Sequence, residues 1–165
     1  MKTLLVLRHA KSSWKNTDLE DHDRPLNKRG KKAAPQMGKL VRKEDLVPDL
    51  ILSSTALRAK TTAELVAEHS KYKGEILFDR RLYLADPTSI VETLQAIDTE
   101  PAGRVMIVGH NPGHEELVRS LTGQDERIPT AALAHIQLPI ENWKELEVSM
   151  EGALVNLWRP REIED

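Results

Sequence analysis

The sequence contains no cysteine among its 165 residues. This absence excludes disulfide bonds, thiolate nucleophiles and cysteine-ligated zinc, and it fits a protein of the reducing cytosol. Aromatic residues make up only 4% of the chain, and the formal net charge is −2. A nucleic-acid-binding module is expected to carry stacking aromatics and a basic balance, so we expect no nucleic-acid partner. Because the chain as a whole is slightly acidic, any anion-binding site must be formed by a local group of cationic side chains.

Long hydrophobic runs are also missing. No stretch approaches the roughly 20 apolar residues that cross a membrane, so we expect no membrane association. The apolar start Leu4–Leu7 is followed by Arg8 and Lys11, and it is shorter than the roughly seven to fifteen residues of a signal-peptide core. Apolar residues at 39% and charged residues at 30% are ordinary for a globular protein. We predict one cytoplasmic domain over residues 1–165, and nothing in the sequence indicates an oligomeric state.

Short apolar runs without alternation are typical of strands that are buried on both faces of a parallel sheet. Three such runs are Leu4–Leu7, Leu50–Leu52 and Val105–Val108. A weaker strand candidate is Glu75–Phe78, and two further strands, Ala132–Leu138 and Ala153–Trp158, follow each other without a helix between them. Such neighbours pair antiparallel. With helices between the other strands, the pattern predicts a three-layer α/β/α sandwich with a mostly parallel mixed sheet.

Helical spacing of apolar residues predicts four helices between these strands. Asn27 is expected to cap the first, and Pro35 inside it should kink the helix or shift its start. Ser54 or Thr55 is expected to cap the second helix, and Asn111 the fourth.

Arginine and histidine side chains stand at the carboxyl ends of the three apolar strands. Arg8 and His9 follow the first strand, Arg58 lies in the first turn of the helix after the second, and His110 follows the third. Ligands of open α/β sheets bind at this edge, so we expect the four residues to converge. A cation in a first helical turn opposes the helix dipole unless an anion lies beside it, and arginine forks suit phosphate. His114 is expected to be a surface residue, and without thiolates or well-spaced carboxylates no metal site is predicted.

Four ordered segments give the sequence a resemblance to a known family. They are Leu7-Arg8-His9-Ala10-Lys11-Ser12, Arg24-Pro25-Leu26-Asn27-x-Arg29-Gly30, Ser53-Ser54-x-x-x-Arg58-Ala59-x-x-Thr62-Ala63 and Val108-Gly109-His110-Asn111-Pro112. In this order the sequence resembles the histidine phosphatase (phosphoglycerate mutase-like) superfamily, and within it the SixA-like phosphohistidine phosphatase branch. The resemblance runs from residue 4 to about residue 118, and it implies a phosphoglycerate mutase-like fold.

The resemblance also implies roles for the four residues. His9 would attack phosphorus and become a phosphohistidine, which water then hydrolyses. Arg8 and Arg58 would bind the phosphoryl oxygens, and His110 would donate a further hydrogen bond. Neither a cofactor nor a metal is required.

The sequence departs from the family at the general acid. Leu84 stands where mutase-like members carry a glutamate, and Asn111 stands where acid phosphatases carry an aspartate. One interpretation is that a carboxyl of the loop before the first helix donates the proton, in a substrate loop that also holds Ser12; the candidates are Asp18, Asp21 and Asp23. The favoured interpretation is that the substrate needs little acid help, because the leaving imidazole of a phosphohistidine has a pKa near neutrality.

These observations favour a phosphatase that removes phosphate from phosphohistidine on a protein. The chain has few residues to spare for insertions that would roof the site, which fits a phosphoprotein partner. One alternative is a broad phosphomonoesterase that acts on small phosphate esters or nucleotides. Another, of a different class, is a regulatory domain that binds phosphate without turnover.

Overall fold

Six strands form one mixed sheet in the computed structural model, which describes residues 1–99 and 102–163. The strands are β1 (Lys2–Arg8), β2 (Leu50–Ser53), β3 (Ile76–Phe78), β4 (Arg104–Gly109), β5 (Leu133–Leu138) and β6 (Ala153–Trp158). Their order across the sheet is β3-β2-β4-β1-β5-β6. Strands β1 to β4 pair in parallel, whereas β5 pairs antiparallel with both β1 and β6. The predicted mostly parallel mixed sheet is confirmed.

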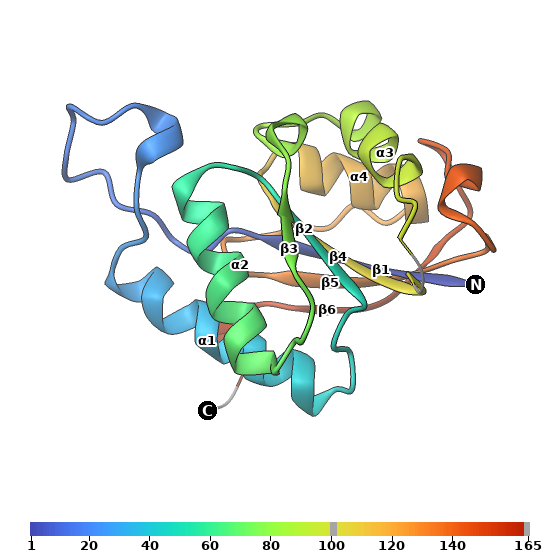
Figure 1. Ribbon diagram of the computed structural model, residues 1–165, viewed down its shortest axis with the longest axis horizontal. Helices are drawn as coiled ribbons and strands as arrows, with labels where there is room; N and C mark the ends of the chain where they lie inside the picture. The colour runs from blue at the N-terminus through green and yellow to red at the C-terminus, as the bar shows by residue number, and fades with distance from the viewer. Residues whose placement is uncertain (100–101, 164–165) are drawn as a thin grey trace.

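Helices cover both faces of the sheet (Figure 1). Helices α1 (Lys28–Lys43) and α2 (Leu57–Ser70) pack on one face, and α3 (Pro87–Gln95) and α4 (Gly113–Thr122) pack on the other. Four short 3-10 helices complete the described elements: η1 (Asp21–Asp23), η2 (Arg80–Leu82), η3 (Trp143–Glu145) and η4 (Pro160–Glu162). The three-layer α/β/α architecture is therefore as predicted. No helix within residues 1–99 and 102–163 has the length and apolar character needed to cross a bilayer.

The central strand β1 shows why the apolar runs do not alternate. Leu4 and Val6 belong to the hydrophobic cluster beneath α3 and α4, while Leu5 and Leu7 belong to the cluster beneath α1 and α2. All four side chains are fully buried. Each contributes about 1.5–3 kcal/mol through burial. Both faces of this strand are thus packed against the core, and the position of the residues that follow it is therefore fixed.

Helix α1 begins where the sequence predicts. The Asn27 side chain accepts a hydrogen bond of 2.9 Å from the backbone N–H of Gly30. Pro35 lies inside the helix, which starts at Lys28 and continues past it, so the predicted shift of its start is wrong. Proline removes one helical hydrogen bond. The buried face of the helix outweighs this loss, and it is formed by Ala34, Met37, Leu40 and Val41.

The predicted caps of α2 are wrong. The residue before the helix is Ala56, which makes no side-chain capping bond. The hydroxyls of Ser54 and Thr55 contact histidine rings instead. Ser54 Oγ lies 2.8 Å from Nε2 of His110, and Thr55 Oγ1 lies 2.8 Å from Nε2 of His22. Tertiary contacts have therefore displaced the local capping that the sequence favours.

The predicted cap of α4 is wrong by one residue. The capping position is occupied by Pro112, after a cis peptide bond from Asn111. Asn111 still accepts a hydrogen bond of 3.2 Å from the backbone N–H of Glu115, and its amide donates to the carbonyl of Ile128 at 2.8 Å. Its side chain therefore ties the start of α4 to the segment before β5.

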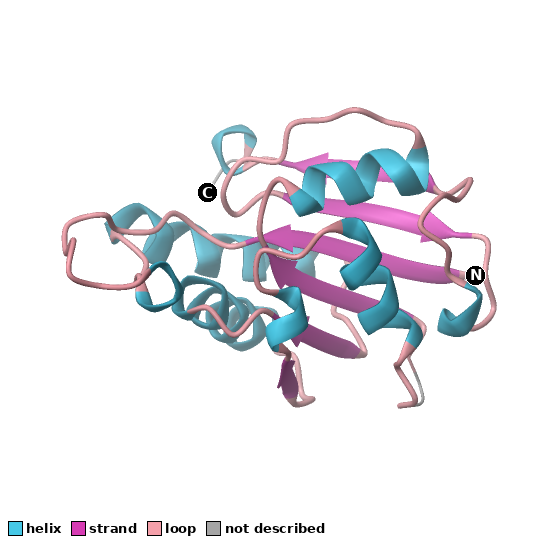
Figure 2. Cartoon of the chain, turned by 90° about the horizontal axis from the view of Figure 1, so that it is seen from above, coloured by secondary structure: helices cyan, strands magenta, loops and turns pink. Residues whose placement is uncertain are grey.

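The long connection between β1 and α1 projects beyond the sheet as a loop (Figures 1 and 2). Its two arms are bonded to each other near their base. Ser13 N–H donates to the Pro25 carbonyl at 2.8 Å, and Asn27 N–H donates to the Lys11 carbonyl at 2.9 Å. The loop is consequently anchored where β1 ends.

Candidate active site

Backbone hydrogen bonds fix the residues that follow β1. The N–H of His9 donates to the carbonyl of Gly109 at the end of β4, at 2.9 Å. The N–H of Ala10 donates to the hydroxyl of Thr62 on α2, also at 2.9 Å. The carbonyl of His9 accepts from the N–H of Ala131 at 3.0 Å. Three separate parts of the chain therefore hold His9 in place.

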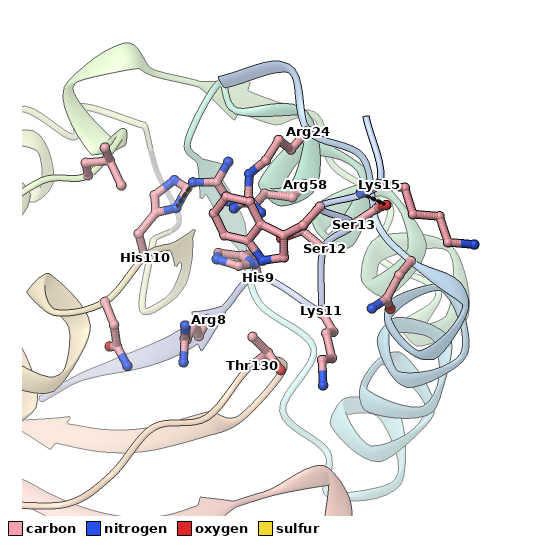
Figure 3. Close-up of a pocket in the computed structure, with 14 residues that line it drawn as sticks. Arg8, His9, Lys11, Ser12, Ser13, Lys15, Arg24, Arg58, His110 and Thr130 are labelled. Carbon is pink, nitrogen blue, oxygen red and sulfur yellow. Dashed lines mark hydrogen bonds between the residues drawn. The ribbon is translucent and has the colours of Figure 1, made fainter. Parts of the chain in front are cut away.

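The structure brings the four residues at the strand ends into one pocket (Figure 3). Arg8, His9, Arg58 and His110 all line this cavity of about 470 Å³. They come from the ends of β1 and β4 and from the first turn of α2. The convergence follows from the parallel pairing of the strands, because their carboxyl ends lie at the same edge.

His9 is buried and held in one tautomer. Its Nδ1 lies 2.7 Å from the carbonyl oxygen of Ala10. A carbonyl oxygen only accepts hydrogen bonds, so Nδ1 carries the proton and Nε2 keeps a free lone pair. Burial lowers the pKa of His9 to about 4; the bond to Ala10 opposes this shift, and the charges of Arg58 and Arg8 add to it. At neutral pH the ring is an uncharged base.

Three arginines that line the same pocket as His9 have unpaired donors. Within the described part of the chain, Arg8 Nε, Arg24 Nη1 and Arg58 Nε are buried and have no hydrogen-bond partner. Leaving such a donor unpaired costs about 1–3 kcal/mol, and more when it is charged. All three residues line the pocket. Guanidinium donors without partners suit the binding of an oxyanion such as phosphate.

Arg24 was not predicted as a site residue. It lies in the loop after β1, and only the folding back of that loop brings it to the pocket (Figure 3). The indole of Trp14 covers it, with the Arg24 guanidinium 3.4 Å from the ring centroid. Trp14 remains 74% exposed, so its indole is held over Arg24 by a cation–π contact and not by burial in a core.

Asp21 links the loop to the arginines. The Arg58 guanidinium donates to its backbone carbonyl at 2.6 Å and to its carboxylate at 2.9 Å, and Arg24 Nε donates at 3.2 Å. The hydroxyl of Tyr83 donates to the same carboxylate at 2.5 Å. Burial raises the pKa of Asp21, but the hydrogen bonds from Tyr83 and Arg58 and the arginine charges outweigh it and lower the pKa to about 2. The carboxylate is therefore an ionised anchor at neutral pH.

The other candidate donors occupy different places. Ser12 is buried and lines the pocket, whereas Asp18 and Asp23 are exposed and do not line it. Leu84 and Asn111, which occupy the positions of the usual acids, both line the pocket. Neither side chain can donate a proton as an acid.

His110 contacts the second arginine of the pocket. Its Nδ1 lies 3.4 Å from Arg58 Nη2, which can only donate, so Nδ1 is the acceptor and Nε2–H donates to Ser54 Oγ at 2.8 Å. Its ring centroid lies 5.2 Å from that of His9. Burial, followed by the neighbouring His9 and Arg58, lowers the pKa of His110 to about 2.

The predicted surface position of His114 is wrong, because its exposed fraction is only 2%. The first turn of α4 packs against the end of β4, where a Cβ on Gly109 would lie 2.7 Å from His114 Nε2. Glycine at this position therefore makes room for the ring. His114 Nδ1 has no hydrogen-bond partner in the described chain, and burial lowers the pKa of the ring to about 3.

Sequence comparison assigns the chain to a family whose expected fold and pocket match those described above. A profile of the histidine phosphatase superfamily (branch 1) matches residues 4–83. An uncharacterised protein of Mycobacterium leprae is 30% identical over 94% of this chain and 100% of its own length. The chain belongs to the histidine phosphatase superfamily.

Solved structures identify the branch. A candidate phosphohistidine phosphatase SixA from Agrobacterium tumefaciens superposes with a TM-score of 0.82 at 28% identity, covering 96% of this chain and 98% of that one. A protein histidine phosphatase SixA complexed with tungstate has the same fold, with a TM-score of 0.83 at 21% identity over 98% of this chain and 99% of that one. The chain is SixA-like, and the expected phosphoglycerate mutase-like fold is confirmed.

Proposed function

We propose that this chain is a phosphohistidine phosphatase that acts on proteins through a phosphoryl group carried transiently on His9. The observation that carries the proposal is the presence, in one pocket, of a neutral, oriented imidazole and three arginines that each have a buried, unpaired donor. The likeness to a protein described as a candidate phosphohistidine phosphatase supports it.

The first half of the reaction transfers the phosphoryl group to His9. The lone pair on Nε2 attacks phosphorus in line, the P–N bond of the substrate breaks, and the leaving imidazole takes a proton from solvent. Arg8, Arg24 and Arg58 stabilise the charge on the transferring oxygens with their fixed donors. The Nδ1–H bond to the Ala10 carbonyl keeps the ring oriented throughout.

The second half releases phosphate. Water attacks the phosphorus on His9, the bond from phosphorus to Nε2 breaks, and the proton of the water leaves with phosphate or to solvent. The donor role expected for His110 requires its ring to exchange the bond to Ser54 for one to the phosphoryl group, because both of its nitrogens have protein partners. That role stays a prediction.

The leaving group is deduced from the missing acid. An alcohol leaves as an alkoxide unless an acid protonates it, whereas imidazole has a pKa near neutrality and leaves readily. Asp21 is ionised and bonded to Arg58, and Leu84 and Asn111 are not acids. A phosphoramidate therefore suits the pocket better than a phosphate ester.

A substrate panel tests this deduction. We expect kcat/KM for a phosphohistidine protein to exceed that for sugar phosphates and nucleotides by about 10²-fold or more, the factor that general acid catalysis commonly supplies. Release of inorganic phosphate, measured with each substrate at equal enzyme concentration, checks it. Equal rates on an alkyl phosphate ester would show instead a broad phosphomonoesterase, and binding of phosphate without turnover of any substrate would show a regulatory domain.

The pH dependence of turnover reports on His9. Because the neutral ring attacks and its pKa is about 4, protonation of His9 should lower kcat by less than about twofold between about pH 7.5 and 5.5. A histidine with an unperturbed pKa of about 6.5 would lose roughly tenfold over this range. The measurement is kcat at saturating substrate, with circular dichroism recorded at each pH to show that the protein stays folded. A tenfold loss with the fold intact would contradict the assignment.

We also propose that residues 1–165 act as one histidine phosphatase domain, because both helix layers pack on the same sheet. The metal-free mechanism and the cytoplasmic location stay predictions. In the described part of the chain, no group of three or more histidine, aspartate or glutamate side chains is arranged to hold a metal ion.

A further inference from the structure

A second cavity, of about 720 Å³, adjoins the pocket that holds His9. The two cavities share four lining residues, namely Arg8, Lys11, Asn111 and Thr130. Figure 3 shows Arg8, Lys11 and Thr130 on the side of His9 that faces away from Arg24. The cavity therefore leads out of the pocket on that side, between α1 and the segment that follows β6.

This cavity is strongly basic. We call it the basic groove, and its cationic lining residues are Arg8, Lys11, Arg29, Arg127, Arg159 and Arg161. Only two carboxylates line it, Glu115 and Glu162, so six cations minus two anions leave a surplus of four positive charges. The whole chain has a net charge of −2, so this surplus is a local feature.

The two carboxylates are already engaged. Glu115 accepts a hydrogen bond of 2.9 Å from the backbone N–H of Ile128, and Glu162 lies 3.4 Å from Arg159. Arg159 is itself held by Glu126 at 3.1 Å and by the carbonyl of Arg127 at 3.0 Å. This network orders the wall of the groove without neutralising its remaining arginines.

Three arginines of the groove are available to a ligand. The side chains of Arg29, Arg127 and Arg161 are exposed and have no ion-pair or hydrogen-bond partner within residues 1–99 and 102–163. Arg29 also lies in the first turn of α1, which contains no acidic residue. A cation there opposes the helix dipole, and an anion in the groove would relieve that repulsion.

We propose that the basic groove binds an acidic stretch of the phosphoprotein substrate, next in its chain to the phosphohistidine that enters the pocket. This inference rests on the proposed function. A small phosphate ester needs only the pocket, whereas the chain on either side of a phosphohistidine within a protein must continue over the surface. Carboxylates along that chain complement the surplus charge, which speeds encounter and fixes the orientation of the substrate.

Charge reversal in the groove tests the proposal. The double variant R127E/R161E changes neither a residue of the pocket nor the Arg159 side-chain contacts. We expect it to lower kcat/KM for a phosphohistidine protein with acidic residues beside the phosphorylated histidine by roughly tenfold, mainly through KM, because each reversal replaces an attraction by a repulsion. Turnover of free phosphohistidine should change less than about twofold. The wild-type rate on the phosphoprotein should also fall with added salt more steeply than the variant rate.

The matched control is K39E/K73E, which changes the net charge equally at two exposed lysines that line neither cavity. It should leave both substrates unaffected. An unchanged rate of R127E/R161E on the phosphoprotein would overturn the groove proposal while the proposed function stands. Equal losses on both substrates would also overturn it, because the substitutions would then act on the pocket. If the wild-type protein hydrolysed neither substrate, the proposed function would fail and the groove proposal with it.

Discussion

Replacing His9 with alanine should abolish turnover and the covalent phosphoenzyme together. Among the imidazole nitrogens of the described residues that line the pocket, Nε2 of His9 is the one without a partner, because both nitrogens of His110 are bonded to Arg58 and Ser54. Loss of a covalent nucleophile costs about 10⁴-fold or more in kcat. Brief incubation with a ³²P-labelled phosphohistidine protein, followed by denaturing electrophoresis, measures the label retained on the chain. An acid-labile, alkali-stable label is expected on the wild-type protein and none on H9A.

The H9A variant should keep its fold and its affinity for oxyanions. His9 contributes no described side-chain hydrogen bond other than that to Ala10, and the three arginines remain. Protection of H9A against thermal unfolding by inorganic phosphate checks that the pocket survives. The matched variant is H22A, which removes a half-buried histidine that does not line the pocket. If H9A still became labelled, another residue would be the nucleophile and the mechanism proposed here would be wrong.

The parts of the site that could be predicted are those that follow directly from strand placement. Arg8 ends β1, His9 and His110 directly follow the apolar strands β1 and β4, and Arg58 lies in the first turn of the helix after β2. Once these strands pair in parallel, their ends must meet at one edge. Local pattern and tertiary structure agree here, so the sequence was sufficient to predict that these residues converge.

The parts that could not be predicted depend on contacts between distant segments. The role of Asp21 follows from its bonds to Arg58 and Tyr83, which are 37 and 62 residues away along the chain. Arg24 reaches the pocket only because the loop folds back beneath Trp14. No periodicity or capping pattern in the sequence predicts these contacts between distant residues. An acidic loop with one arginine has the composition of a solvated surface.

The errors in helix capping have the same origin. Ser54 is a good capping residue by local preference, but its hydroxyl lies within hydrogen-bond distance of His110 Nε2. A buried imidazole N–H needs a partner, and leaving it unpaired would cost more than the loss of a cap. Function-bearing residues thus compete with local structure for the same polar groups.

Replacing His114 with leucine should stabilise the protein, and the gain should grow as the pH falls. At neutral pH the buried Nδ1 of His114 has no partner in the described chain, and removing such an atom is expected to gain about 1–3 kcal/mol. In the unfolded chain the ring takes up a proton near pH 6.5, whereas in the folded protein burial lowers its pKa to about 3. Protons therefore bind preferentially to the unfolded state between these two values, so wild-type stability is fully present above about pH 6.5 and is lost as the pH falls toward about 3.

Urea unfolding of wild-type, H114L and H114Q proteins at about pH 7 and about pH 5 separates the two effects. Titration of one histidine costs about 1.4 kcal/mol per pH unit well below its unfolded pKa, so the gap between H114L and wild type should widen by about 2 kcal/mol from about pH 7 to about pH 5. Glutamine removes the titration but keeps a polar group in the core, so H114Q should be less stable than H114L at pH 7 and lose stability in parallel with it at lower pH. His9 and His110 are also buried with lowered pKa values, so both variants should still lose stability in acid. A pH-independent gap between H114L and wild type would show that His114 is not held neutral by the fold.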